Sequence, residues 1–208
     1  MPNINLRCII ALVLLLTCPF LIEESLAREL ECGSVKGLSL DSPMNFCIKD
    51  KIYVAAVGHI SENTHNDLLN FLNASVNKGY EIHSITFHSL GGTMLSGMLM
   101  GAFIREVKLD THVGKGSVCA SACFLAFIGG WSRKVTHDGK IGNHQMSYST
   151  STQGDIQAIQ DMIGILSEYH KSLNVSPLAV TAAMTRRSNE MYWYSPKEQK
   201  EWGVVTTR

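Results

Sequence analysis

The segment GSVCASACFLAFIGG, residues 116–130, decides the fold, because a strand and a helix meet within it. Its first residues continue a strand-like stretch, THVGKGSV (111–118), and its second half is a run of small and apolar residues that ends at Gly129 and Gly130. Paired glycines are a natural helix stop. The segment therefore predicts a short helix that follows directly on a strand, with Ser121 at the junction.

Ser121 has two interpretations at such a junction. As an N-capping residue it would accept a hydrogen bond from the first helical turn and carry no chemistry. As a nucleophile it would expose its Oγ beside the N–H of Ala122, and it would require a base nearby. His144, in the segment KIGNHQM (140–146), is the residue type that such a serine needs. The residues alone leave both interpretations open.

From Lys51 onward the chain alternates strand-like and helix-like segments, which predicts an α/β fold with parallel strands covered by helices. KIYVAAVGHI (51–60) and IHSITFHS (82–89) are strand-like, and GVVT (203–206) is expected to close the chain as a strand. Apolar residues at helical spacing define the expected buried faces of three helices: Leu68, Leu69, Leu72 and Val76; Leu95, Leu99, Phe103 and Val107; Ile156, Ile159, Ile163, Leu166 and Leu173.

A second glycine pair lies in HSLGGTMLSG (88–97), where a strand ends just before a helix. Gly91 and Gly92 permit close backbone approach and leave amide N–H groups pointing outward at the positive end of a helix. Such N–H groups can stabilise an oxyanion. Taken alone, the glycines favour an ordinary tight turn over an oxyanion site.

Residues 1–27 have the features of an export signal. Arg7 precedes an uncharged apolar run, CIIALVLLLTCPFLI (8–22), and SLA (25–27) offers the small residues that a signal peptidase requires. Cleavage after Ala27 is therefore the favoured interpretation.

Two alternatives rank below cleavage. The first is a membrane anchor formed by residues 8–22, and the second is a lipoprotein with its lipid attached at Cys18. The mature protein is expected to be periplasmic or secreted, or associated with the membrane if the anchor is kept. It would comprise an N-terminal segment, 28–50, and one domain, 51–208.

Cys8 and Cys18 would be removed with the signal, which leaves four of the six cysteines. Export would bring these four into an oxidising compartment, where an even number favours disulfides. A disulfide between Cys32 and Cys47 would cross-link the N-terminal segment. Cys119 and Cys123 flank the junction serine, and they either form a short bridge or remain two small buried thiols. The cysteines lack the paired spacing of a structural zinc site.

The charge balance argues against nucleic acid as a partner. Among the 208 residues, 18 are Lys or Arg and 18 are Asp or Glu, so no basic excess attracts phosphate groups. The length suits one sizeable domain. No metal or cofactor is expected, because the remaining histidines lack ligand spacing: His59, His65, His83, His112, His137 and His170.

The order of these motifs resembles the ClpP/crotonase superfamily, specifically the Clp protease proteolytic subunit and its exported relatives. In that family a diglycine follows a strand, a serine lies in an Ala–Ser step and a histidine lies in a His–Gln step. The matching residues here are Gly91 and Gly92, Ala120 and Ser121, and His144 and Gln145. The likeness continues through 152–173 and 194–205, and covers nearly all of the expected domain.

The resemblance implies the ClpP/crotonase-like fold, with repeated ββα units, and a serine hydrolase site. Ser121 would attack a carbonyl, His144 would transfer the proton, and the N–H groups of Gly92 and Ala122, beside Gly91, would bind the oxyanion. The substrate would be a peptide or an unfolded protein segment. Members of the superfamily generally self-assemble, so a homo-oligomer is expected. No ATPase partner is expected, because ATP is not supplied outside the cytoplasm.

The family's catalytic aspartate has no direct counterpart in this chain. Alignment back from Gly203 places Met191 at that position, with Asn189 and Glu190 next to it. The orienting group of His144 would then be Asn189, Glu190 or a backbone carbonyl. Two rival hypotheses follow: an inactive binding or scaffold protein that keeps the fold, and a thiol redox protein that uses the cysteines around the serine.

Overall fold

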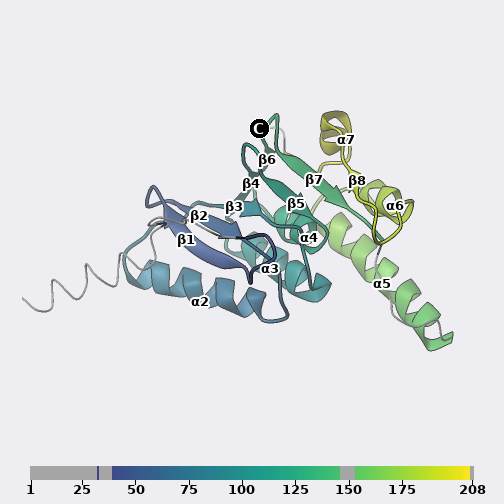
Figure 1. Ribbon diagram of the computed structural model, residues 1–208, viewed down its shortest axis with the longest axis horizontal. Coiled ribbons are helices and arrows are strands. Elements are labelled where there is room, and N and C mark those ends of the chain that lie inside the picture. Colours follow the sequence, from purple (N-terminus) through teal and green to yellow (C-terminus); the bar gives the residue numbers. More distant parts are fainter. Residues whose placement is uncertain (1–31, 33–38, 146–152, 207–208) are drawn as a thin grey trace, which may run out of the picture.

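The computed structural model describes residues 32, 39–145 and 153–206 (Figure 1). The signal or anchor expected within 1–27, and the side chains of Ile156 and Ile159, lie outside this description. None of the helices in the described ranges combines the length and the hydropathy needed to cross a bilayer.

The larger of two sheets has five strands in the order β1-β2-β3-β4-β6 (Figure 1). Only the β1–β2 pair is antiparallel, so the sheet is mainly parallel as expected. Its strands are β1 (Asn45–Lys49), β2 (Tyr53–Val57), β3 (Ser84–His88), β4 (Asp110–Val113) and β6 (Arg133–Val135).

The smaller sheet contains β5 (Val118–Ala120), β7 (Lys140–Asn143) and β8 (Tyr192–Trp193) in that order. β5 is parallel to β7, whereas β8 is antiparallel to it. The single strand expected near residues 111–118 is thus two strands in different sheets. The chain turns between them, where the N–H of Ser117 donates to the carbonyl of Gly114 at 3.1 Å.

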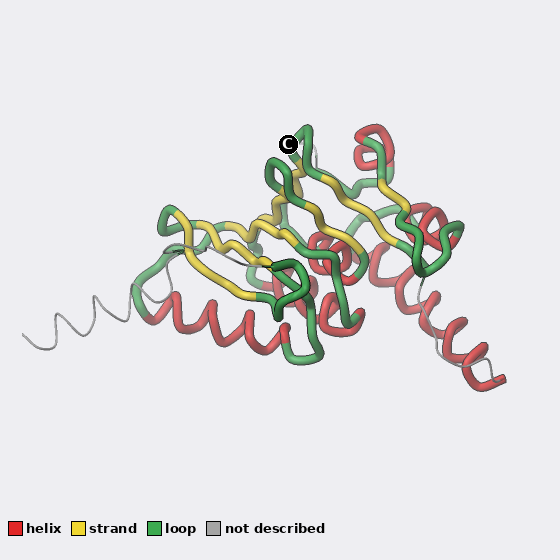
Figure 2. Tube along the Cα trace, in the orientation of Figure 1, coloured by secondary structure: helices red, strands yellow, loops and turns green. Residues whose placement is uncertain are grey.

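Six helices are described, and α2 and α3 lie along the same side of the larger sheet (Figures 1 and 2). In the same views α5 extends away from the two sheets, and α6 and α7 lie near β8. The bounds are α2 (Thr64–Asn77), α3 (Met94–Glu106), α4 (Ala122–Ile128), α5 (Gln153–Ser172), α6 (Leu178–Met184) and α7 (Pro196–Glu201).

The buried face of α3 differs from the prediction. Leu95 and Leu99 are 62% and 41% exposed, whereas the buried residues are Ser96, Gly97, Met100, Gly101 and Ile104. Small residues face the core here because α3 packs directly on the backbone of α4. A Cβ added at Gly97 would overlap the carbonyl of Ala122, and one at Gly101 would overlap that of Leu125.

Other helix faces agree with the prediction in part. Leu68 and Leu72 of α2 are buried, but Leu69 and Val76 are exposed. Leu166 and Leu173, which mark the C-terminal half of the 152–173 pattern, are buried as expected.

Residues 203–206 do not form the expected closing strand. The N–H of Thr206 donates to the carbonyl of Arg133, and the N–H of Arg133 donates to Thr206 Oγ1, so this end of the chain lies beside β6 without a regular ladder.

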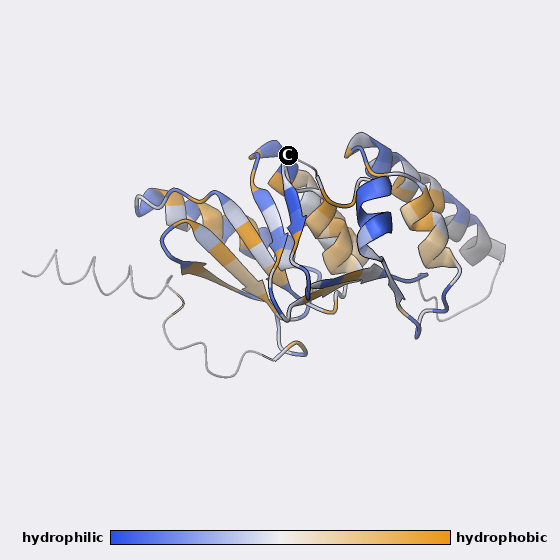
Figure 3. Ribbon diagram, turned by 90° about the horizontal axis from the view of Figure 1, so that it is seen from above, coloured by the Kyte–Doolittle hydropathy of each residue, from blue (hydrophilic) through white to orange (hydrophobic). Residues whose placement is uncertain are grey.

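The helix α4 is the centre of the core. All seven of its residues are buried, and Figure 3 shows the contrast between this hydrophobic helix and the hydrophilic α7. Such a helix must be covered on every side. The short helix expected within 116–130 is thus observed, and Ser121 directly precedes it as predicted.

The guanidinium of Arg133 binds backbone carbonyls at the C-terminal end of α4. Arg133 is buried and donates to five backbone carbonyls, those of Ile128, Gly130, Leu173, Gly203 and Val204. Burial lowers the pKa of Arg133 to about 10, so the side chain stays charged near neutral pH. A cation suits this position because helix C-termini carry partial negative charge.

A disulfide joins Cys32 to Cys47 in β1, with a Cα–Cα distance of 5.0 Å. The pairing expected for the N-terminal segment is therefore present, and it attaches Cys32 to the antiparallel edge of the larger sheet.

Candidate active site

Ser121 lies at the turn between β5 and α4 with φ 56° and ψ −124°. This is a left-handed backbone conformation that a residue with a Cβ adopts only at a cost of about 1–3 kcal/mol. Its side chain makes no capping hydrogen bond to α4. The capping interpretation of Ser121 therefore does not describe this structure, whereas a strained strand-to-helix turn is the setting in which nucleophilic serines are presented.

Ser121 and His144 line the same cavity, which has a volume of about 250 Å³. Four residues with polar side chains line the cavity: Ser121, Asn143, His144 and His170. Gly92 and Ala122 also line it, and their polar groups are those of the backbone. The rest of the wall is apolar: Met94, Leu125, Leu166, Val180, Ala183 and Met184. A concave apolar site with a few convergent polar groups is the usual form of a ligand pocket.

His144 follows β7 and is held by its neighbours. Its N–H donates to Asn143 Oδ1 at 2.9 Å, and its ring Nδ1 lies 2.7 Å from the backbone carbonyl of Gln145. A carbonyl can only accept, so Nδ1 carries the proton and Nε2 of the neutral ring has a free lone pair. This tautomer is the one that a general base requires.

No hydrogen bond joins the Ser121 and His144 side chains within the described parts of the chain. Such contacts are often long in unliganded sites and shorten when substrate binds. The two residues nevertheless line one cavity although they are 23 positions apart in the sequence.

The N–H groups of Gly92 and Ala122 both lie on the cavity wall, and neither has a backbone partner among the described residues. The N–H of Ala122 belongs to the first turn of α4, where helical donors have no intrahelical acceptor. Gly92 has φ 141° and its Cα faces Ile60 and His59 so closely that no Cβ would fit. These amides are free to receive an oxyanion.

Gly91 has a different place from Gly92. Its N–H donates to Ser89 Oγ at 3.0 Å and is therefore engaged within the turn. A Cβ at Gly91 would meet the Ala120 carbonyl and the Ser121 Cβ. Gly91 thus allows the diglycine turn to approach the serine turn, but it does not supply a free donor.

Asn189 and Glu190 are exposed and do not line the cavity. Among the described residues neither side chain contacts His144, and the Nδ1 partner of His144 is the Gln145 carbonyl instead. Of the three groups proposed to orient His144, a backbone carbonyl is the one that hydrogen-bonds its ring among the described residues.

A disulfide between Cys119 and Cys123 spans the serine turn, with a Cα–Cα distance of 5.2 Å. Both cysteines are fully buried. Of the two interpretations left open, the short bridge is therefore the one found. The covalent link closes the strand-to-helix turn around Ser121.

His170 belongs to none of the motifs recognised in the sequence, yet it lines the cavity and is 0% exposed. Its Nδ1 lies 2.7 Å from the Leu166 carbonyl, and its Nε2 is buried without a hydrogen-bond partner. Burial lowers the pKa of His170 to about 4, so its ring is neutral at neutral pH. The one available signal was its spacing from Leu166 and Leu173, which places it on the buried side of α5.

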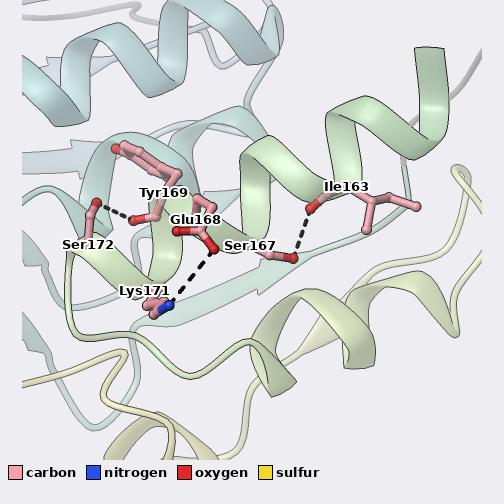
Figure 4. A network of polar contacts seen from close by, with 6 residues as sticks. All are labelled: Ile163, Ser167, Glu168, Tyr169, Lys171 and Ser172. Carbon is pink, nitrogen blue, oxygen red and sulfur yellow. Dashed lines mark hydrogen bonds and ion pairs between the residues drawn. The ribbon is translucent and has the colours of Figure 1, made fainter. Parts of the chain in front are cut away.

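Figure 4 shows local polar contacts along α5, and none of the residues that it labels lines the cavity. Ser167 Oγ donates to the Ile163 carbonyl, and Lys171 and Glu168 form an exposed ion pair at 4.0 Å. Tyr169 donates its hydroxyl to the Leu125 carbonyl at 2.9 Å and so fixes α5 on α4. Of these contacts only that of Tyr169 joins α5 to another element, so it helps to set the rotation of α5 and with it the position of His170.

No three His, Cys, Asp or Glu side chains come together as a metal site anywhere in residues 39–145 and 153–206.

Comparison with solved structures shows the same fold in two proteins. A variant of ClpP1 from Listeria monocytogenes has a TM-score of 0.53 at 17% identity, over 75% of this chain and 90% of that chain. A variant of the membrane-bound stomatin-specific protease 1510-N has a TM-score of 0.53 at 16% identity, over 74% and 75%. No family model and no curated protein matches the chain. The chain therefore has the ClpP-type fold that the order of its motifs indicated.

Proposed function

We propose that this chain, which has the ClpP-type fold, is an exported serine peptidase that acts without an ATPase partner. The observation that carries the proposal is the strained Ser121 turn on the wall of the same cavity as His144, whose protonated Nδ1 leaves Nε2 as the acceptor. One of the two neighbours in fold is itself described as a protease, which supports peptide hydrolysis over other acyl transfers.

The arrangement supports a complete reaction cycle. Ser121 Oγ attacks the scissile carbonyl carbon while His144 Nε2 takes the hydroxyl proton, and the oxyanion receives the N–H groups of Gly92 and Ala122. The proton then passes to the leaving amine as the C–N bond breaks. Water, deprotonated by the same nitrogen, hydrolyses the acyl-enzyme and restores the serine. Each oxyanion donor contributes about 3 kcal/mol to transition-state stabilisation.

The missing acid favours a slow enzyme, and it also supports a second candidate, an inactive binding protein that keeps the fold. A backbone carbonyl orients the His144 ring but does not offset the positive charge that the ring gains in the transition state. Loss of the corresponding charge reduces the rate by about 10⁴-fold in a serine protease triad. The thiol redox alternative has less support, since Cys119 and Cys123 are buried and oxidised.

The labelling of the purified protein by a fluorophosphonate probe tests the peptidase proposal. We expect labelling of the wild type, and its loss in Ser121→Ala and in His144→Ala. Ser117→Ala, a matched serine on the preceding turn, should label like the wild type. Labelling that persists in Ser121→Ala would reject the nucleophile, and no labelling of the folded wild type would favour the inactive binding protein.

The two disulfides support export to an oxidising compartment, because structural disulfides are rare where thiols are kept reduced. We propose cleavage after Ala27, with a retained anchor at residues 8–22 as the alternative. Edman sequencing of the protein from the culture fractions would distinguish the two N-termini. We also propose a homo-oligomer, which the exposed leucines of α3 support and sedimentation would test.

A further inference from the structure

The disulfide between Cys119 and Cys123 closes a very short loop. The two cysteines are 4 positions apart and their Cα atoms are 5.2 Å apart, whereas an extended chain would separate them by about 13 Å. The other disulfide, Cys32–Cys47, spans 15 positions. Loop-closure entropy favours bonds that close long loops, so the shorter bond gains less global stability from it. Its main effect is therefore on the residues that it encloses.

The enclosed residues, Ala120, Ser121 and Ala122, include the strained position of the turn. The backbone of Ser121 has φ 56°, a region that residues with a Cβ avoid, and its hydroxyl makes no capping bond to α4. The N–H of Ser121 donates to the Gly142 carbonyl at 3.1 Å, and its carbonyl accepts from the N–H of Phe124 at 2.9 Å. These hydrogen bonds attach Ser121 to β7 and to α4, and the disulfide closes the turn between β5 and α4 covalently.

The disulfide also connects the elements that carry the proposed reacting groups. Cys119 lies in β5, which pairs in parallel with β7, and His144 directly follows β7. Cys123 lies in the first turn of α4, next to Ala122, whose N–H is a proposed oxyanion donor. Both cysteines are 0% exposed and belong to the hydrophobic core, so neither end of the bond can shift without disturbing close packing. The bond therefore sets the distance between the strand and the helix on either side of Ser121.

We infer that Cys119 and Cys123 are positioning residues for Ser121, and that the chain with these two thiols free folds but presents its serine in a relaxed, poorly reactive turn. The inference rests on the proposed peptidase function. Formation of the bond removes two protons and two electrons from the thiols, and a disulfide oxidant such as oxidised glutathione takes up both and becomes two thiols. The site is then reactive only after oxidation of the pair.

The test measures fluorophosphonate labelling of the wild type in two redox states. The protein is unfolded, reduced and refolded with a phosphine reductant, and part of it is then treated with oxidised glutathione. Alkylation and mass spectrometry establish which thiols are free. We expect the reduced form to label about 10- to 100-fold more slowly at saturating probe, with the half-saturating probe concentration unchanged, because binding needs the cavity whereas reaction needs a correctly placed hydroxyl. Oxidation should restore the rate.

Two double variants separate this bond from the other disulfide. Cys119→Ala/Cys123→Ala should label as slowly as the reduced wild type and should not respond to oxidised glutathione. Cys32→Ala/Cys47→Ala should label at the wild-type rate while its remaining disulfide is intact. Equal labelling rates of the oxidised and the reduced wild type would overturn the inference. A reduced chain that circular dichroism shows to be unfolded would also overturn it, because the bond would then serve folding rather than placement.

A stability measurement that needs no reaction separates the failure of the inference from the failure of the proposed function. Ser121→Gly and Ser121→Ala both lack the hydroxyl, and glycine relieves strain that alanine keeps. We expect the difference between their urea midpoints to fall to less than about half in the Cys119→Ala/Cys123→Ala background, since an open turn can relax around alanine. If the difference falls and the oxidised wild type does not label, the bond fixes the turn and the peptidase proposal fails alone. If the oxidised wild type labels but the difference is the same in both backgrounds, the inference fails alone.

Discussion

Ser121 combines a strained backbone with a proposed catalytic role. Its positive φ is tolerated because Gly91 leaves room for the turn and the disulfide holds both of its ends. Strain of this kind persists where the surrounding structure determines the conformation, and it is common at catalytic residues.

Replacing Ser121 with glycine should therefore relieve strain that alanine would keep. We expect Ser121→Gly to be about 1 kcal/mol more stable than Ser121→Ala, although glycine normally destabilises the native state. Urea denaturation of the two variants measures the difference, and both lack the hydroxyl. An alanine variant as stable as the glycine variant would show that the turn is unstrained.

His170 should make the protein less stable in mild acid. The pKa of His170 is about 4 in the folded protein and about 6.5 when unfolded, so between these values the unfolded chain binds the extra proton. Stability is therefore fully present above pH 6.5 and is lost as the pH falls towards 4, by about 3 kcal/mol in total. His170→Met should lose less over this interval. Urea denaturation at pH 7 and pH 4.5 tests this, and equal losses in both proteins would contradict it.

At the residue scale, short motifs in the sequence were sufficient to select the residues of the candidate site that follow strands. Ser121, His144 and Gly92 each stand at a strand end, where side chains and amides project from the sheet. His170 was missed because its place on the cavity wall depends on the rotation of α5, which long-range contacts with α4 help to set. Asn189 and Glu190 were expected near the site by alignment alone, and they lie on an exposed turn.

At the scale of elements, α4 is the unit on which the site depends. Ser121 precedes its first turn, and Arg133 binds the carbonyls at its other end. The prediction of α4 from small apolar residues and two glycines was correct because a short, fully buried helix needs no polar face. The prediction of the α3 face was wrong for a related reason. Large leucines usually mark the buried side, but here α3 lies so close to α4 at Gly97 and Gly101 that a Cβ at either position would overlap a carbonyl of α4.

Removing the Arg133 side chain should be severely destabilising. Arg133→Met leaves five carbonyls without their donors, four of which belong to segments other than β6 and its preceding turn. We expect a loss of about 3–5 kcal/mol in the free energy of unfolding. The adjacent exposed Lys134 is the control, since Lys134→Met should change stability by less than about 0.5 kcal/mol. Thermal denaturation of both variants would show the contrast, and similar melting temperatures would refute it.

At the scale of the whole molecule, the alternation of strands and helices was sufficient to predict a parallel-rich α/β fold. It did not predict that the strands divide into two sheets. That division depends on the turn between β4 and β5, and on β8, a strand of only two residues that pairs antiparallel with β7. Pairing of so few residues is decided by packing rather than by local propensity.

The two disulfides should differ in their resistance to reduction. Cys119 and Cys123 are both fully buried within α4 and β5, whereas Cys32 is partly exposed outside the sheets. A thiolate reductant has to reach the sulfur that it attacks. We expect Cys32–Cys47 to open first in native buffer, while Cys119–Cys123 opens only in denaturant. Alkylation followed by mass spectrometry would reveal the order, and simultaneous opening would show that α4 unfolds locally at low cost.

The contact between Gly97 and Gly101 of α3 and the backbone of α4 has a consequence for how the protein tolerates variation. A methyl group at either position would displace α4 as a rigid body, and the strained turn in front of it would move as well. In a saturation mutagenesis scan, two of the least permissive codons should therefore lie some twenty positions upstream of Ser121, in a helix that does not contain the proposed nucleophile or base.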